Sequence, residues 1–280
     1  MTRLRSVLFA PASSAELLAK LPRSGPDAVV LDLEDAVAPS AKAAARRIAA
    51  AAAPDLRAAH PALAIYVRVN AIATEFFADD LAAITPALTG VMVPKIETPD
   101  HVAAAIDAIR SVGLDLPVFA GIETVAGVVR ADAILAAPGI EAAYFGAEDY
   151  VTDLGGVRTS ESTEVLYARS RVAIAARMAG VSAIDQIVSS YDDEGAFQRD
   201  VAAGRSLGYR GKLCIHPRQV GWSNTGFSPS PGEVERARRL VDAYDAAVAA
   251  GIASIGFEGQ MIDEPLARQA RAVLALHDAT

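Results

Sequence analysis

Residues 28–53 read AVVLDLEDAVAPSAKAAARRIAAAAA, a short apolar run followed by an alanine-rich segment. The run Ala28–Leu33 has the length and aliphatic character of a strand that is buried on both faces of a parallel sheet. Ala41–Ala53 is rich in alanine, the strongest helix former, and carries three basic residues. A buried strand followed by a helix is the repeating unit of α/β proteins, in which helices cover a parallel sheet.

The same unit recurs along the chain. Two further segments, Pro99–Val112 and Thr163–Ala179, carry apolar residues every three or four positions, which is typical of helices. Eight strands are predicted, at Ser6–Phe9, Ala28–Leu33, Ala64–Val69, Gly90–Lys95, Pro117–Ile122, Ala142–Phe145, Ala183–Ile187 and Lys212–Ile215. Because eight strand–helix units close a (β/α)8 barrel, we predict an α/β fold of the TIM-barrel type.

The pattern changes after the eighth strand. Residues 226–232, GFSPSPG, form a link rich in helix and strand breakers, and helices are predicted at Glu233–Ala250 and at Pro265–His277. About fifty residues bury too little apolar surface to be stable alone. We therefore predict a barrel catalytic domain over residues 1–225 and a C-terminal extension or lid over residues 226–280.

Composition excludes several classes of protein. The chain has 280 residues, of which 52% are hydrophobic and 21% charged, so neither a disordered nor a fibrous protein is expected. A net charge of −8 disfavours nucleic-acid and anionic-membrane partners and favours a small-molecule substrate. Cys214 is the single cysteine, which excludes an internal disulfide, and no apolar run reaches about 18 residues. We expect a cytoplasmic protein.

Polar residues stand at the carboxyl ends of six of the eight predicted strands, where barrel enzymes carry their catalytic groups. They are Asp32, Glu34, Asp35, Arg68, Asn70, Lys95, Glu97, Glu123, Glu148, Asp149 and His216. Most are acidic, and carboxylates that converge on one mouth repel one another unless a cation lies among them. Oxygen ligands with no cysteine favour a hard ion that keeps water or substrate in open positions, so Mg²⁺ is the predicted metal.

Glu123 and Asp149 are the preferred Mg²⁺ ligands. Each closely follows a predicted strand, beside a small residue or a tight turn, in GIET (121–124) and GAED (146–149). Such acids can instead cap the following helix, and this alternative stays open for each acid taken singly. Glu34 and Asp35 are predicted to hold metal-bound water, with direct ligation of the metal as the alternative.

Seven short motifs occur in order along the chain, with an eighth in the tail. They are RSVLFAP (5–11), LDLEDAV (31–37), VRVN (67–70), PKIE (94–97), IET (122–124), FGAED (145–149), IHP (215–217) and GQMIDEP (259–265). Together they resemble the citrate lyase beta-subunit-like CoA-ester lyases of the HpcH/HpaI aldolase/citrate lyase superfamily. Within that group the chain is most similar to stand-alone citramalyl-CoA and β-hydroxyacyl-CoA lyases.

The resemblance implies a barrel that binds Mg²⁺ and an acyl-CoA substrate. By this resemblance the Mg²⁺ ligands are Glu123 and Asp149, Arg68 faces the substrate, Phe9 and Lys20 lie along the CoA path, and Ile215 and His216 contact the thioester arm. It assigns proton delivery to Asp263, which reaches the site from a neighbouring subunit of a homotrimer or a multiple of three. Glu16 departs from the family pattern, because the citramalyl-CoA lyases carry a lysine there and an acid repels a CoA phosphate.

The implied reaction is a retro-Claisen cleavage of a β-hydroxyacyl-CoA to acetyl-CoA and a keto acid, which could also run as a condensation. Mg²⁺ can chelate the substrate carboxylate and hydroxyl, and the planar guanidinium of Arg68 can stabilise the enolate oxygen. Asp263 would then protonate the enolate carbon.

Other functions and roles stay open. The chain could be a metal-dependent aldolase acting on free hydroxy-keto acids, or the citryl-carrier-protein lyase subunit of a citrate lyase complex. A non-catalytic module is disfavoured because the four residues with implied chemical roles are all present. Arg68 could be a structural partner of Asp32 or Glu34, and His216 could only anchor a loop. A Schiff-base role for Lys95 is disfavoured, because nearby carboxylates keep a lysine protonated.

Overall fold

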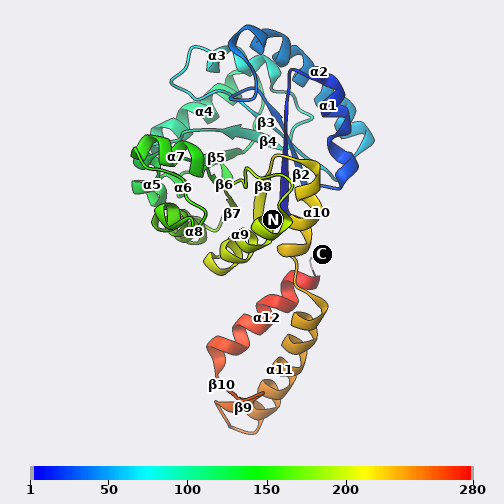
Figure 1. Ribbon diagram of the computed structural model, residues 1–280, viewed down its shortest axis with the longest axis vertical. Helices are drawn as coiled ribbons and strands as arrows, with labels where there is room; N and C mark the ends of the chain where they lie inside the picture. Colours follow the sequence, from blue (N-terminus) through cyan, green and yellow to red (C-terminus); the bar gives the residue numbers. More distant parts are fainter. Residues whose placement is uncertain (1–2, 279–280) are drawn as a thin grey trace. The chain divides into compact units, whose positions relative to one another are not determined.

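The computed structural model describes residues 3–278, which begin with a closed barrel of eight parallel strands (Figure 1). The strands are β1 (Ser6–Pro11), β2 (Ala28–Asp32), β3 (Ala64–Arg68), β4 (Gly90–Val93), β5 (Val118–Ile122), β6 (Ile140–Phe145), β7 (Ser182–Asp185) and β8 (Gly211–Cys214). They follow one another in chain order, and β1 pairs with β8 to close the barrel. The predicted (β/α)8 fold is confirmed, since each predicted apolar run overlaps one of these strands.

Helices follow the strands, connecting each of the first seven to the next, and cover the outside of the barrel (Figure 1). They are α1 (Ala15–Lys20), α2 (Lys42–Ala59), α3 (Phe77–Asp80), α4 (Pro99–Ser111), α5 (Val125–Val129), α6 (Ala131–Leu135), α7 (Ala147–Leu154), α8 (Leu166–Ala179), α9 (Glu194–Leu207) and α10 (Pro217–Gly226). Short 3₁₀ helices lie at Leu21–Ser24, Pro39–Ala41, Leu81–Ala83 and Thr163–Val165.

Helix α2 is longer than the predicted Ala41–Ala53. It continues through Pro54, although a proline inside a helix removes a hydrogen bond and costs about 3 kcal/mol. Its last turns are stabilised by tertiary contacts, because Leu56 is buried and the Arg57 guanidinium donates to the Leu63 carbonyl at 2.9 Å. These contacts lie outside the helix, so hydrophobic periodicity could not predict its end.

Alternate residues of the strands fill the barrel interior. The buried set is Leu4, Val7, Ala28, Val30, Ala64, Tyr66, Met92, Phe119, Ala142, Tyr144, Ile184 and Leu213. The ring of Phe119 meets Tyr66 and Tyr144 edge-on, at centroid distances of 5.3 and 5.9 Å. Because side chains alternate along a strand, Asp32 continues the inward face of β2 and Arg68 that of β3. The apolar interior therefore ends in a polar layer at the carboxyl ends of the strands.

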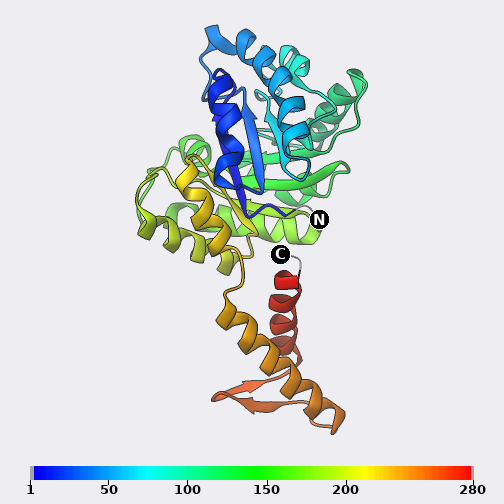
Figure 2. The same cartoon turned by 90° about the vertical axis from the view of Figure 1, so that its right-hand side faces the viewer.

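The chain divides into two compact units after Asn224, and the second contains α11 (Pro231–Ala249), β9 (Ile255–Phe257), β10 (Gln260–Ile262) and α12 (Glu264–Asp278). Figure 2 shows α11 and α12 side by side. Ser230 begins α11 in a capping box with Glu233. The small core of this unit consists of Ala237, Leu240, Tyr244, Ile262, Ala267 and Ala270.

The β9–β10 hairpin was not predicted from the sequence. Its two strands pair antiparallel, with Gln260 opposite Phe257, and Glu258 and Gly259 form the turn. Both turn residues have positive φ, +49° and +79°, as a two-residue type I′ hairpin turn requires. The strands are only three residues long, too short for an alternating pattern to be visible.

Within residues 3–278, none of the helices combines the length and the apolar composition needed to cross a membrane.

Candidate active site

A cavity of about 440 Å³ lies at the carboxyl ends of the barrel strands. It is lined by Phe9, Ala10, Pro11, Asp32, Asp35, Ala36, Arg68, Glu123, Tyr144, Gly146, Ala147, Glu148, Asp149, Ile187, Leu213 and Ile215. The acidic lining residues come from the segments around β2, β5 and β6, whereas β1, β7 and β8 supply an apolar wall. The cavity thus joins a charged half and an apolar half.

Glu123 follows β5 and is buried beneath this cavity. Its Oε1 accepts hydrogen bonds from the Lys95 backbone N–H at 2.9 Å and from the Tyr144 hydroxyl at 3.1 Å. Burial, together with the nearby carboxylates of Glu34 and Asp149, raises the pKa of Glu123 to about 8. Among residues 3–278, Oε2 has no hydrogen-bond donor, so this oxygen is open to a ligand.

Two glycines make room for this arrangement. A Cβ at Gly146 would lie 2.2 Å from Oε2 of Glu123, and a Cβ at Gly121 would lie 2.5 Å from the Tyr144 hydroxyl. Neither distance is compatible with a larger residue unless the carboxylate or the tyrosine moves. The small residues beside the predicted ligand therefore allow Glu123 and Tyr144 to approach each other.

Arg68, at the end of β3, is held by two carboxylates. Its Nε and Nη2 donate to the two oxygens of Asp32, each at 2.7 Å, and its Nη1 lies 2.8 Å from Oε2 of Glu34. Burial alone would lower the pKa of Arg68, but Asp32 and the other neighbouring acids raise it well above its ordinary value. The guanidinium also lies 5.1 Å from the centre of the Phe9 ring. The structural ion pairs considered from the sequence are therefore present, with the side chain still facing the cavity.

Lys95 links the acids of two strands. Its ammonium lies 2.6 Å from Oε1 of Glu34 and 3.3 Å from Oδ1 of Asp149. Burial lowers the pKa of Lys95, but the hydrogen bond and the charge of Glu34 outweigh this effect and raise it, which agrees with a protonated lysine rather than a Schiff-base nucleophile. Its backbone has a φ of +52°, a strained conformation for a residue with a side chain, and this conformation aims its N–H at Glu123.

The charges at the mouth suit a divalent cation. The carboxylates of Asp32, Glu34, Asp35, Glu123 and Asp149 outnumber the cations of Arg68 and Lys95. Among the described residues, no group of three or more His, Cys, Asp and Glu side chains is arranged to hold a metal by itself. An ion between Glu123 and Asp149 would have open positions for water and substrate oxygens, which is the binding mode typical of Mg²⁺.

Comparison with known proteins agrees with this geometry. Residues 5–217 match the pattern of one protein family. The chain belongs to the HpcH/HpaI aldolase/citrate lyase family. Membership of this family makes it a carbon–carbon lyase.

Relatives of this HpcH/HpaI family member cover nearly its whole length. A citrate lyase subunit beta-like protein of Deinococcus radiodurans is 53% identical over 278 residues, which are 99% of this chain and 98% of the relative. A (3S)-malyl-CoA thioesterase of Cereibacter sphaeroides is 32% identical over 276 residues, 98% of this chain and 95% of the relative. The crystal structure of CitE from Mycobacterium tuberculosis in complex with magnesium, acetoacetate and coenzyme A has a TM-score of 0.82 and 31% identity, and covers 98% of this chain and 97% of that one.

Not every predicted site residue of this family member lines the cavity. Lys20 is on the exposed side of α1, where it forms an ion pair with Glu16. His216 packs its ring against Tyr191 at 4.9 Å. Asp263 belongs to the second unit, immediately before α12. The lining does include Phe9, Asp35, Arg68, Glu123, Asp149 and Ile215 among the predicted residues, while Glu34 contacts the lining residue Arg68.

Tyr144 is the site residue that sequence reasoning missed. It stands in the run Ala142–Phe145, whose other residues are apolar, so it resembled a core aromatic. The signal that could have identified it is its position two residues before Gly146, on the inward face of β6 and near the mouth.

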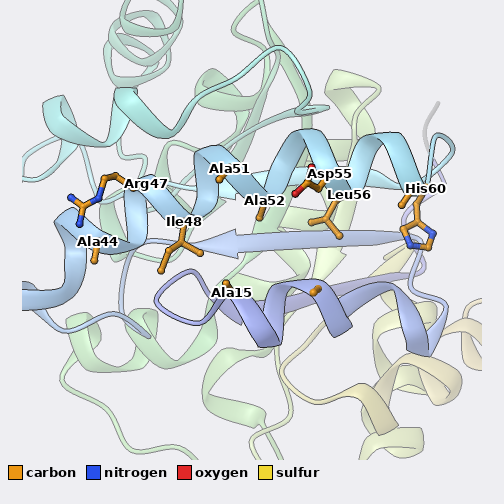
Figure 3. Close-up of a pocket in the computed structure, with 11 residues that line it drawn as sticks. Ala15, Ala44, Arg47, Ile48, Ala51, Ala52, Asp55, Leu56 and His60 are labelled. Carbon is orange, nitrogen blue, oxygen red and sulfur yellow. The ribbon is translucent and has the colours of Figure 1, made fainter.

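A hollow larger than this cavity lies elsewhere in this lyase, on the outside of the barrel. It is a groove of about 680 Å³ between α1 and α2, mostly lined by alanines, with Arg47 and His60 at its two ends (Figure 3). Asp55 is its only lining carboxylate within the described chain. Size alone therefore does not locate the candidate active site, whereas the convergence of charged groups does.

Proposed function

We propose that this chain is a Mg²⁺-dependent lyase that cleaves a β-hydroxyacyl-CoA, such as citramalyl-CoA or malyl-CoA, to acetyl-CoA and a keto acid. The observation that carries the proposal is the pair Glu123 and Asp149 beside Arg68 in one cavity, with an apolar wall next to them. The magnesium, acetoacetate and coenzyme A bound to the related CitE support both the metal and the substrate class.

Glu123 and Asp149 would hold the Mg²⁺ ion. When bound, the ion supplies a Lewis acid for the hydroxyl and carboxylate oxygens of the substrate. Lys95 positions both of these carboxylates, because its backbone N–H donates to Glu123 and its ammonium lies beside Asp149. Glu34 and Asp35 would orient water at the rim of this site, and Glu34 also anchors both Lys95 and Arg68.

Arg68 would stabilise the enolate of the departing acetyl-CoA. Its guanidinium has five N–H groups, and the contacts with Asp32 and Glu34 leave others directed elsewhere. Because both Asp32 oxygens hold it in a planar, bidentate pair, the guanidinium is positioned before the substrate arrives. An oxygen that gains negative charge as the carbon–carbon bond breaks would then meet a cation that needs no rearrangement.

The thioester arm would lie against the apolar half of the mouth. Phe9 and Ile215 line that half, and His216 follows Ile215 directly. Lys20 would contact the CoA moiety farther from the reacting carbon. We further propose that Asp263 of a neighbouring subunit, in a homotrimer or a multiple of three, protonates the enolate carbon.

Product analysis tests the proposal. The purified protein is incubated with malyl-, citramalyl-, citryl- and hydroxymethylglutaryl-CoA, with Mg²⁺ or with EDTA, and the CoA products are separated by chromatography. A lyase releases acetyl-CoA and a keto acid in the presence of Mg²⁺. Release of free CoA and an intact hydroxy acid would show a thioesterase instead. Cleavage of free hydroxy-keto acids, or of a citryl carrier protein but no CoA ester, would favour the corresponding alternative.

A further inference from the structure

The pairing of the barrel strands is shortest between β7 and β8. Only two residue pairs join these strands, Ile184 with Gly211 and Asp185 with Lys212. Ile187 and Ile215, which line the apolar half of the cavity, lie beyond the last of these pairs. The hydrogen bonds of the sheet therefore do not set the distance between the segment after β7, which carries Ile187, and the segment after β8, which carries Ile215.

Gln219 joins the two segments at this point. Its side-chain Oε1 accepts from the Ile215 backbone N–H at 2.8 Å, and its Nε2 donates to the Val188 carbonyl at 2.8 Å. The side chain is fully buried and stands in the first turn of α10, where the backbone N–H of Gln219 donates to the His216 carbonyl at 3.0 Å. A carboxamide carries both a carbonyl acceptor and N–H donors, so one side chain can satisfy an N–H and a carbonyl at the same time. Gln219 thus replaces the missing rungs of the sheet ladder.

We propose that Gln219 is a positioning residue that sets the spacing of Ile187 and Ile215 and thereby the shape of the wall that receives the acyl-thioester arm. The kinetic part of this inference rests on the proposed function. The clamp itself rests on the geometry of one buried amide between two loops.

Neither glutamate nor methionine reproduces both contacts. A glutamate would keep an acceptor for Ile215 but lose the donor to Val188, and a methionine of similar size would provide neither contact. Either change leaves the Val188 carbonyl, and with methionine also the Ile215 N–H, without its partner at this partly buried position, which favours separation of the loops and entry of water. The charged half of the cavity does not depend on Gln219, because Glu123 and Arg68 are held by other residues.

Hydrogen exchange tests the clamp without any substrate. In the wild-type protein the Ile215 amide should exchange slowly, and Gln219→Met should accelerate its exchange at least about tenfold. Ser223→Ala is the matched control, since Ser223 is also fully buried on α10 but donates at 2.7 Å to the Arg5 carbonyl, before β1 begins. Fast exchange of Ile215 in the wild type, or equal acceleration in both variants, would overturn the clamp. The wild-type measurement decides this even if Gln219→Met fails to fold.

Kinetics and metal binding test the functional consequence. Gln219→Met should raise KM for the CoA thioester about tenfold, which corresponds to about 1.4 kcal/mol, with a smaller change in kcat. Its Kd for Mg²⁺, measured by calorimetry, should stay within about twofold of the wild type. An unchanged KM, or an equal loss of Mg²⁺ affinity, would overturn the positioning role. If the wild type cleaves no CoA ester, the proposed function fails, whereas the exchange experiment still decides whether the clamp exists.

Discussion

Replacing Glu123 by glutamine should abolish Mg²⁺-dependent activity and at the same time stabilise the metal-free protein. The amide keeps an oxygen for the N–H of Lys95 and the hydroxyl of Tyr144, so the local packing survives. What disappears is a carboxyl group whose pKa is raised from its ordinary 4.5 to about 8, mainly by burial. A carboxyl group with a higher pKa in the folded chain binds its proton more tightly there, so stability falls as the pH rises from 4.5 to about 8.

The size of the effect follows from this shift. pH 7 lies about 2.5 units above the ordinary pKa of 4.5, and at about 1.36 kcal/mol per unit the raised pKa lowers the free energy of unfolding there by about 3 kcal/mol. Above pH 8 the cost reaches its maximum, and below pH 4.5 it vanishes. Glu123→Gln should therefore unfold at higher urea concentrations than the wild type at pH 8, and at the same concentration near pH 4.5.

Urea denaturation in EDTA measures this difference, with Asp55→Asn as a control for loss of an exposed carboxylate on α2. Added Mg²⁺ should stabilise the wild type and the control but not Glu123→Gln, because a ligand that binds only the folded state stabilises it. A variant less stable than the wild type at pH 8 would refute the buried-charge reasoning. Normal Mg²⁺-dependent cleavage by the variant would refute the metal-site assignment.

Three further outcomes are expected. Arg68→Lys should lose at least about tenfold in kcat/KM, because a point charge cannot replace a planar fork, and an unchanged rate in steady-state assays would leave this arginine a structural role only. The inactive Asp263→Asn and Glu123→Gln variants should regain part of their activity when they are mixed and exchange subunits, because some sites would then combine an intact barrel with an intact tail. Mass spectrometry monitors the exchange, and exchange without recovery of activity would contradict a site shared between subunits. Asp200 forms an ion pair with the buried ammonium of Lys212. Asp200→Asn should destabilise the protein at neutral pH, because despite its burial the charge of Lys212 lowers the pKa of Asp200. This contribution is present above about pH 4 and is lost as the pH falls further, so acid titrations of stability for wild type and variant should converge there, and parallel curves would contradict the ion pair.

Local sequence was sufficient to predict the barrel. Most strands are short, largely buried apolar runs, such as Ala28–Leu33. Several of the helices between them were predictable from alanine content or apolar spacing, such as Pro99–Val112. Eight such units in one chain favour a closed barrel, since a parallel sheet must be covered by helices and eight strands in chain order can close on themselves. By contrast, the helix through Pro54 and the β9–β10 hairpin depend on contacts with distant segments and on a turn with positive φ, and neither is visible in periodicity.

The candidate site was only half predictable for the same reason. Glu123 and Asp149 follow strands, and all strand ends of a parallel barrel meet at one mouth, so their proximity follows from topology alone. Topology does not specify which oxygen accepts which hydrogen. The Tyr144 hydroxyl donates to Glu123, the backbone N–H of Lys95 reaches Glu123 through a positive φ, and the Gln219 amide donates to the Val188 carbonyl. Each of these contacts is about 3 Å long and joins residues that are far apart in the chain. Such contacts exist only once the barrel has closed, because closure brings side chains from different strands within hydrogen-bonding reach.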